Sequence, residues 1–254
     1  MNSGKYIFSQ LMEILPQKKF YKMVKRYNAD KWTKTMSCWN QLLLMMFGQL
    51  SGCDSLRVLA CIVAAHQNKS YHLGFGKGVI ARSTLEYANA YRDYRLFEEF
   101  AYYMINLAQS KRIDREFYLN GQFYAFDSTT IDLCLSLYEW VRFRKAKDIA
   151  MLYKQRWQVE LFFRWIKQHL RVKSFWGNTE NAVRIQIYVA IITYCLVAIV
   201  EHDCKLQRST FNVLRVLNHS LLDKTPIRDL FENQEKLDDR YVDDCMQLKL
   251  DFEY

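Results

Sequence analysis

Apolar residues recur at helical spacing through most of the chain, and two stretches near its start are more apolar than an exposed helix tolerates. These are residues 37–50 (SCWNQLLLMMFGQL) and 54–67 (DSLRVLACIVAAHQ). Ser37 and Asp54 are residues suited to capping the two helices, and Gly52 breaks the pattern between them. We therefore expect the first part of the chain to be helical, with these helices packed on each other or on the next domain.

The stretch that follows is basic and also reads as helical. The pattern STLE predicts a capping box, in which Ser83 and Glu86 open a helix that carries Arg92 and Arg95. A further helix is expected over residues 96–109. This pair has two interpretations: a helix-turn-helix that binds DNA, or a plain helical connector.

A long helix is expected over residues 178–201. Within it, residues 185–200 (IQIYVAIITYCLVAIV) form the best candidate for a membrane span. The run is shorter than the roughly 20 residues that a span requires, and it contains Gln186. We interpret it as a core helix, with a membrane span as the alternative.

Between residues 122 and 137 the apolar period changes from helical spacing to alternation. Phe123 and Ala125 alternate with their neighbours up to Asp127, and a second alternating run begins at Ile131. This pattern predicts a hairpin of two strands. The order of helices, a short β-pair and further helices indicates a mainly helical α+β fold.

Composition limits the class of protein. The chain has 254 residues, 50% of them hydrophobic, with eight glycines and two prolines, so it can bury a real core in one or two domains. The formal net charge of +9 favours a polyanionic partner, with nucleic acid first and an anionic membrane surface second.

The cysteines suggest neither a zinc site nor a disulfide framework. All seven lie in apolar segments without C-x-x-C spacing, and their number is odd. They are expected to be reduced, buried thiols of a cytoplasmic protein.

A single stripe of polar residues interrupts the aromatic helix expected over residues 152–170 (LYKQRWQVELFFRWIKQHL). Tyr153, Arg156, Glu160 and Lys167 fall within an arc of roughly 60° on an ideal helix. A solvated strip with an ion pair between Arg156 and Glu160 would explain this. However, Arg before Glu is the poorer orientation for such a pair, and a charged strip flanked by aromatic residues suits a cleft wall.

The spacing of these four residues resembles the Y-(2)-R-(3)-E-(6)-K signature of bacterial insertion-sequence transposases with a DDE catalytic triad, of the insertion sequence four type. Two further segments resemble the same family. Residues 124–133 (YAFDSTTIDL) have the form of its first catalytic strand, and residues 177–191 (GNTENAVRIQIYVAI) resemble the segment after its signature helix. The N-terminal helices are similar to its amino-terminal domain.

This resemblance implies a ribonuclease-H-like core in which three carboxylates hold two divalent metal ions, Mg²⁺ or Mn²⁺. By position, Asp127 corresponds to the first carboxylate and Glu160 to the last, so both are the expected catalytic and metal-binding residues. Asp127 has a simpler reading as an Asx-turn residue. Carboxylate oxygens are hard ligands that suit Mg²⁺.

The resemblance also implies that Tyr153, Arg156 and Lys167 contact transposon-end DNA, since Arg and Lys neutralise phosphates and Tyr hydrogen-bonds to them or stacks. Trp157 and Trp165 are candidates for stacking on a flipped base. At helical spacing between apolar neighbours they are more typical of a core.

The chain departs from the family pattern between the two matched carboxylates. Only 32 residues separate Asp127 from Glu160, too few for the strands, the helix and the second catalytic Asp that the family places there. The acidic residues in the gap are Asp132, Glu139 and Asp148, and none matches that Asp. With two carboxylates instead of three, catalysis is expected to be severely weakened or absent.

The sequence thus predicts an N-terminal helical domain followed by a truncated ribonuclease-H-like catalytic domain. The expected function is DNA transposition at transposon ends. The alternative is an internally deleted, inactive DNA-binding remnant that inhibits the intact transposase. Double-stranded DNA is the expected partner, together with a second copy or the intact enzyme, in the bacterial cytoplasm at the nucleoid and without a membrane. The expected domains are residues 1–78, N-terminal and helical; 79–115, a helical connector or DNA-binding element; 116–205, the truncated catalytic domain; and 206–254, a C-terminal helical tail.

Overall fold

A computed structural model describes residues 4–76, 80–111, 175–206 and 210–231. Within these ranges the regular elements are helices, and no strand occurs. This confirms the mainly helical character of the expected fold. The strand pair expected between residues 122 and 137 lies outside the described residues. In chain order the elements are α1 (Ile7–Ile14), α2 (Gln17–Arg26), α3 (Cys38–Leu50), α4 (Leu56–Ala65), the short 3-10 helix η1 (Gln67–Lys69), α5 (Arg82–Tyr91), α6 (Arg95–Lys111), α8 (Glu180–Asp203) and α9 (Thr210–Ser220).

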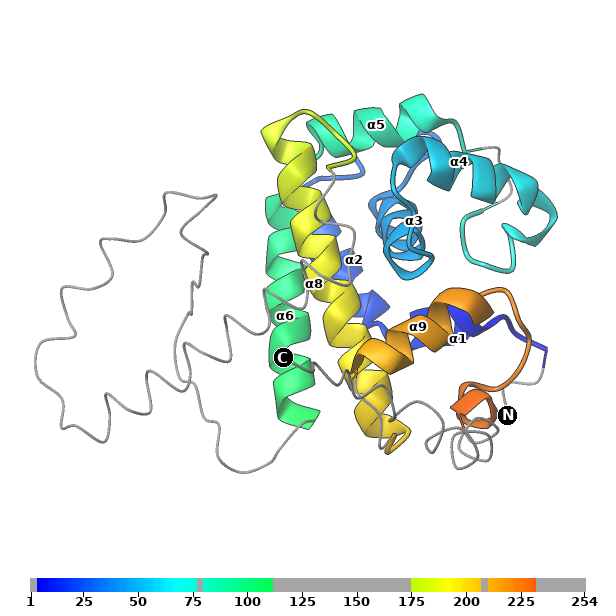
Figure 1. Cartoon of the computed structure of the whole chain (residues 1–254). Coiled ribbons are helices and arrows are strands. Elements are labelled where there is room, and N and C mark those ends of the chain that lie inside the picture. Colours follow the sequence, from blue (N-terminus) through cyan, green and yellow to red (C-terminus); the bar gives the residue numbers. More distant parts are fainter. Residues whose placement is uncertain (1–3, 77–79, 112–174, 207–209, 232–254) are drawn as a thin grey trace, which may run out of the picture.

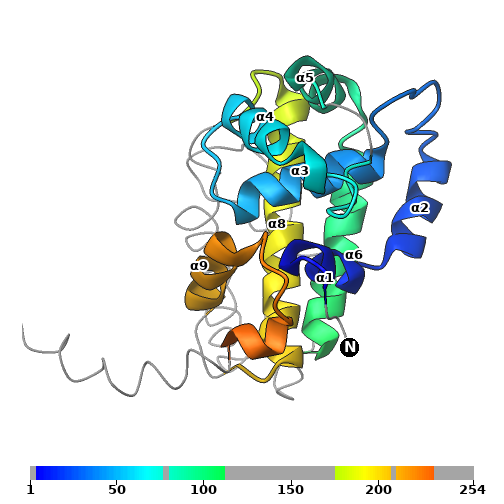
Figure 2. The same ribbon diagram turned by 90° about the vertical axis from the view of Figure 1, so that its right-hand side faces the viewer.

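The long helix α8 is the centre of the arrangement. It packs against α6 along its length and also against α3, α5, α9 and α1 (Figure 1). Turning the molecule by 90° shows α2 on the outer side of α6 and α9 on the opposite side of α8 (Figure 2). The helix predicted over residues 178–201 is therefore present, and it is surrounded by protein.

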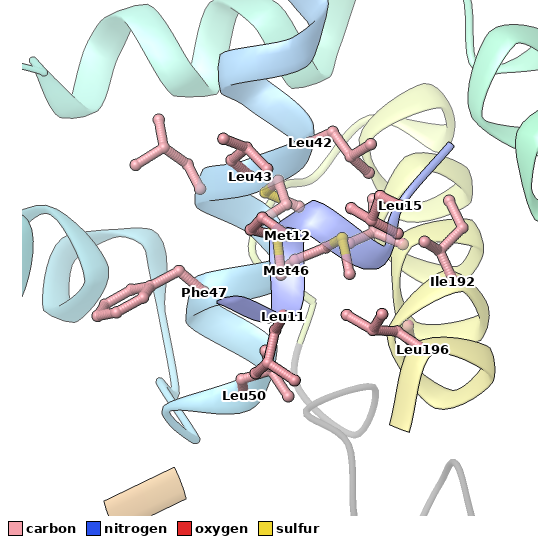
Figure 3. Packing of buried hydrophobic residues seen from close by; sticks show 14 of the residues in the cluster. Leu11, Met12, Leu15, Leu42, Leu43, Met46, Phe47, Leu50, Ile192 and Leu196 are labelled. Carbon is pink, nitrogen blue, oxygen red and sulfur yellow. The ribbon is translucent and has the colours of Figure 1, made fainter. Parts of the chain in front are cut away.

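Apolar side chains from widely separated parts of the chain form one cluster. Leu11 of α1, Met46 of α3 and Ile192 and Leu196 of α8 belong to it (Figure 3). All residues of α3 except Asn40 are buried, which confirms that this helix is too apolar for an exposed position. Members of the cluster come from each of the four expected domains, whose boundaries remain a prediction.

By length and composition α8 is the one described helix that could cross a membrane. However, 72% of its most apolar 18-residue window is buried inside the structure. This burial supports the interpretation of residues 185–200 as part of a core helix.

The start of α3 follows the prediction, and the start of α4 corrects it. The Ser37 hydroxyl accepts a hydrogen bond from the Asn40 N–H at 3.1 Å. The N-cap of α4 is Ser55 instead of Asp54, because the extended backbone of Ser55 directs its hydroxyl to the Val58 N–H at 3.3 Å.

The expected capping box at the start of α5 is wrong. The helix begins at Arg82, and its N-cap, Ala81, makes no side-chain cap. Ser83 therefore lies inside the first turn, and Glu86 accepts a hydrogen bond from Arg82 Nε at 2.6 Å. The helix also ends at Tyr91, so it does not carry Arg92 and Arg95. The next helix, α6, confirms the helix expected over residues 96–109.

Replacing Ser37 with Ala should lower the free energy of unfolding by about 1 kcal/mol, because one N–H in the first turn of α3 loses its acceptor. Urea denaturation of the two proteins would measure the difference. Ser83→Ala is the matched control. It removes the same hydroxyl from a helical position without a cap, so it should be neutral or slightly stabilising. A loss at Ser83 as large as that at Ser37 would contradict the observed helix starts.

The expectation of buried cysteines holds for three of the five described cysteines. All five described cysteines are free of disulfides. Cys38, Cys53 and Cys195 are buried and Cys204 is partly exposed, whereas Cys61 is exposed because it lies on the face of α4 opposite the buried positions. Burial raises the pKa of the Cys38 thiol to about 12, which keeps it protonated at neutral pH.

Candidate active site and its supporting helices

The five residues expected at the active site lie in one interval of the chain, residues 112–174, which is outside the described residues. The same holds for the acidic residues of the gap and for the two tryptophans considered as stacking residues. The structure describes the helices on both sides of this interval. The residues expected at the site are Asp127, Tyr153, Arg156, Glu160 and Lys167.

The helices before and after the interval, α6 and α8, run parallel and side by side (Figure 1). Near one end of the pair, the Tyr188 hydroxyl of α8 donates a hydrogen bond to the Glu98 carboxylate of α6. Near the other end, Lys111 Nζ of α6 lies 2.5 Å from Asp203 Oδ2 of α8. The interval therefore starts at the Lys111 end of the helix pair. It ends at the opposite end of the pair, where α8 begins.

The contacts between α6 and α8 change the pKa values of their polar groups. Burial and the neighbouring Glu98 carboxylate raise the pKa of Tyr188, so its hydroxyl remains a donor. Burial alone would raise the pKa of Asp203, but hydrogen bonds from Lys111 and His202 lower it below its ordinary value. At neutral pH Tyr188 is therefore a donor and Asp203 an acceptor.

The chain re-enters the described core through a buried tryptophan. The N–H of Trp176 donates to Gln186 Oε1 of α8 at 2.8 Å. Its ring lies so close to Gly48 of α3 that a Cβ added there would be 2.7 Å from Cη2. Thr179 then caps α8 by accepting a hydrogen bond from the Ala182 N–H at 3.2 Å. The position at which the interval ends is therefore fixed against both α3 and α8.

A polar network of two buried and two partly buried residues joins α3, α5 and α8; we call it the Arg92 network, and it consists of Gln41 and Asn89, which are buried, and Arg92 and Asn181, which are partly buried. Gln41 Nε2 donates to Asn89 Oδ1 at 2.6 Å, and Arg92 Nη1 donates to Gln41 Oε1 at 2.9 Å. Asn181 Nδ2 donates to the carbonyl oxygens of Asn89 at 2.9 Å and Arg92 at 2.6 Å. The network links the start of α8 to the turn between α5 and α6.

Arg92 is the central member of this network, and it is not available to bind DNA. Its side chain is 11% exposed, and its guanidinium lies 3.9 Å from Asp30 Oδ1. It also donates to the carbonyl oxygen of Met36. This role was not predicted from the sequence. The sequence signal that could have predicted this role is the presence of polar residues such as Gln41 inside an otherwise apolar helix.

Among the described residues, no group of three or more His, Cys, Asp or Glu side chains is arranged to hold a metal ion. The expected metal ligands, Asp127 and Glu160, lie outside the described residues.

Comparisons with known families divide the chain at the connector between α4 and α5. Residues 3–76 match a domain of unknown function, DUF4372. Residues 81–196 match the transposase DDE domain, and this range contains the interval together with α5, α6 and most of α8. The residues expected at the site therefore fall within the same matched range as α5, α6 and most of α8.

Named relatives agree with the domain match. A protein of Sinorhizobium fredii described as transposase y4zB is 48% identical over 94 residues, which are 37% of this chain and 24% of the relative. A Geobacillus stearothermophilus protein described as a transposase for insertion sequence element IS5377 is 55% identical over 51 residues, or 20% and 14% of the two chains. A Synechocystis protein described as a transposase for element IS4SA is 34% identical over 78 residues, or 31% and 23%.

The chain belongs to the insertion-sequence transposases of the DDE class. This confirms the family resemblance seen in the sequence. The matched segments span about a quarter or less of the length of the curated relatives. No solved structure matches the chain.

Proposed function

We propose that this chain acts in the transposition of an insertion sequence, as a transposase that cuts transposon-end DNA and joins it to a target by metal-dependent phosphodiester chemistry. The carrying observation is the signature spacing of Tyr153, Arg156, Glu160 and Lys167, which falls inside the range matched by the transposase DDE domain. Double-stranded DNA at the transposon ends is the proposed substrate.

Asp127 and Glu160 are the proposed metal ligands, and the chemistry of this donor set fits Mg²⁺ or Mn²⁺ because both provide hard carboxylate oxygens. When bound, such ions activate a water or a DNA 3′-hydroxyl and stabilise the leaving oxygen. Two carboxylates neutralise less charge than three, so the activity should be weak. A truncated ribonuclease-H-like domain over residues 116–205 is proposed as the carrier of the site.

The remaining signature residues, Tyr153, Arg156 and Lys167, are proposed to bind end DNA beside Glu160. A guanidinium and an ammonium neutralise phosphates, and a phenol donates a hydrogen bond to them. The net charge of +9 supports a polyanionic substrate. We place the protein in the bacterial cytoplasm at the nucleoid, and assembly with a second copy or an intact transposase is part of the proposal.

Replacing Glu160 with Gln should reduce Mg²⁺-dependent nicking of a supercoiled plasmid carrying the cognate ends by about 100-fold, because even outer partners of metal ligands cost 10–100-fold. Binding to the same DNA should persist, since Gln removes a negative charge and leaves the cations in place. Nicking that continues unchanged in Glu160→Gln would contradict the metal role of this residue.

The alternative of an internally deleted DNA-binding protein rested on the 32 residues between Asp127 and Glu160, and the transposase matches do not favour it. The same assay separates the two functions. A wild-type chain that binds the ends but leaves the plasmid intact with Mg²⁺ and with Mn²⁺ would identify the inactive form.

A further inference from the structure

The helix α2 and the loop after it carry a concentration of positive charge on the surface of the molecule. Seven cations lie within residues 18–34, and Asp30 is the one acidic residue in that range. All seven cations are exposed. We call this set the α2 basic surface; it consists of Lys18, Lys19, Lys22, Lys25, Arg26, Lys31 and Lys34.

The helical part of this surface faces solvent because the opposite side of α2 is held in the core. Its five cations occupy an arc of about 120° on an ideal helix, and the buried residues Phe20, Met23 and Val24 lie on the other side. The ring of Phe20 packs edge-on against Phe100 of α6, with 4.9 Å between centroids. Figure 2 shows α2 on the outside of the helix bundle.

The acidic residue within the range does not neutralise the surface. Asp30 Oδ1 accepts a hydrogen bond from the Cys38 N–H at 2.7 Å and faces Arg92 at 3.9 Å. Its carboxylate is therefore directed toward the core side of the loop, away from the lysines of α2.

Within the part of the chain that the structure describes, most of these lysines lack an anionic partner. Arg26 forms an ion pair with Glu99 of α6, and Lys19 Nζ lies 5.3 Å from the centroid of the Tyr103 ring. Among the ion pairs formed within the described residues, none involves Lys18, Lys22, Lys25, Lys31 or Lys34.

Part of this arrangement of charge is unfavourable for the helix itself, although Lys25 and Arg26 in the last turn suit the helix dipole. Lys18 and Lys19 stand in the first turn of α2, where the helix dipole disfavours cations. Lys22 is spaced i,i+4 from both Lys18 and Arg26, and like charges at this spacing repel. A polyanion bound to this face would relieve both effects, whereas folding alone gains nothing from them.

An exposed aromatic residue lies in the same surface. Trp32 is 89% exposed and has a φ of 66°, a left-handed conformation that is rare for a bulky side chain. Lys31 Nζ lies 5.6 Å from its ring centroid. A projecting ring beside lysines combines the two kinds of group that contact nucleic acid, cations for phosphates and an aromatic face for a base or sugar.

We propose that the α2 basic surface binds the phosphate backbone of double-stranded DNA and that Trp32 adds a contact to a base or sugar. The proposal rests on the proposed function in taking DNA as the partner. It extends that function to residues 3–76, whose matched family has no assigned function. The bound DNA would lie along the outer side of α2, next to the helix α6 that leads into the interval 112–174.

Removing three lysines from α2 tests the surface in the full chain. The variant carries Lys18→Gln, Lys22→Gln and Lys25→Gln. The matched control carries Arg57→Gln, Lys205→Gln and Lys224→Gln at exposed positions elsewhere, so both variants lose three positive charges. Binding to a labelled duplex of arbitrary sequence is followed by fluorescence anisotropy at salt concentrations from about 50 to 200 mM.

We expect the slope of log K against log salt to become shallower by about 2.7 in the α2 variant, since each phosphate contact contributes about 0.9. Affinity at about 100 mM salt should fall at least about tenfold, and the control should keep the wild-type slope. Equal changes in both variants, an unchanged slope in the α2 variant, or a wild-type chain that does not bind the duplex would each overturn the proposal. So would binding to phosphatidylserine vesicles that depends on these lysines while duplex binding does not.

Trp32 is tested by Trp32→Ala and Trp32→Phe. The Ala variant should bind the duplex several-fold more weakly with an unchanged salt slope, because the lost group is uncharged, and Phe should restore most of the affinity. Wild-type affinity in Trp32→Ala would remove the aromatic contact. The arbitrary duplex makes this test independent of nicking, so loss of the proposed transposase function would appear only in the Glu160→Gln assay.

Discussion

Replacing Arg92 with Leu should lower the free energy of unfolding by about 3 kcal/mol or more, which is a large part of the stability of a typical domain. The guanidinium donates to Gln41 Oε1 at 2.9 Å and to the carbonyl oxygen of Met36. A Leu side chain leaves both acceptors in the interior without these donors. Each unsatisfied buried group costs about 1–3 kcal/mol, and Asp30 also loses its neighbouring cation.

Chemical denaturation of Arg92→Leu beside Arg95→Leu would measure this effect with a matched control. Arg95 is three residues away and pairs with Asp93, but its side chain is 63% exposed. Exposed ion pairs contribute about 0–1 kcal/mol, so Arg95→Leu should change stability little. Arg92→Lys should be intermediate, because one ammonium does not reproduce the planar fork of donors. Equal losses at positions 92 and 95 would contradict the central role of the Arg92 network.

Replacing Trp176 with Ala should cost about 3–5 kcal/mol, as expected for a large side chain removed from a core. The ring is 7% exposed and fills the space above Gly48 between α3 and α8. Gly48 allows the backbone of α3 to approach the ring. It has no side chain that could fill the cavity left when the ring is removed. The substitution should also weaken any DNA cleavage, because Trp176 fixes the end of the interval that carries Glu160.

Thermal or urea unfolding would test the prediction, with Trp32→Ala as the control of identical chemistry at an exposed position. That control should change stability by less than about 0.5 kcal/mol. Trp176→Phe should cost much less than Trp176→Ala. The indole N–H of Trp176 is buried without a hydrogen-bond partner among the described residues, and its loss offsets part of the reduced packing. A large loss in Trp32→Ala, or none in Trp176→Ala, would contradict the observed burial.

Local sequence patterns predicted the helices well where burial and capping act together. Ser37 caps α3 as expected, and Gly52 separates α3 from α4 with a φ of 65°. The start of α4 was misplaced by one residue, because Asp54 and Ser55 are both able to cap, and the start of α5 was misplaced by two, because its N-cap Ala81 has no capping side chain. Backbone conformation decides between such neighbours: the extended Ser55 caps α4, and an ion pair between Arg82 and Glu86 replaces the capping box at α5.

Tertiary contacts decided the features that the sequence did not reveal. In the sequence Arg92 looks like any other cation in a basic stretch. Only the folded structure shows that α3 places Gln41 against it. In the sequence Cys61 looks like the other cysteines in apolar segments. The orientation of α4 in the fold places it on the exposed face. For the site the situation is reversed. The spacing of Glu160 with its signature neighbours predicted the family, because such a pattern can be read from the order of residues along the chain, and the roles of these residues stay a prediction.

Because α6 and α8 run parallel, the segment between them begins at one end of the helix pair and finishes at the other (Figure 1). Such a connection must cover the length of α6, about 25 Å at 1.5 Å per residue, and no upper limit on its length follows from the buried helices. Insertions and deletions in that segment can therefore be accommodated without repacking the core. By the same reasoning, a chain cut within residues 112–174 should still assemble from its two pieces, since each contributes one helix of the pair.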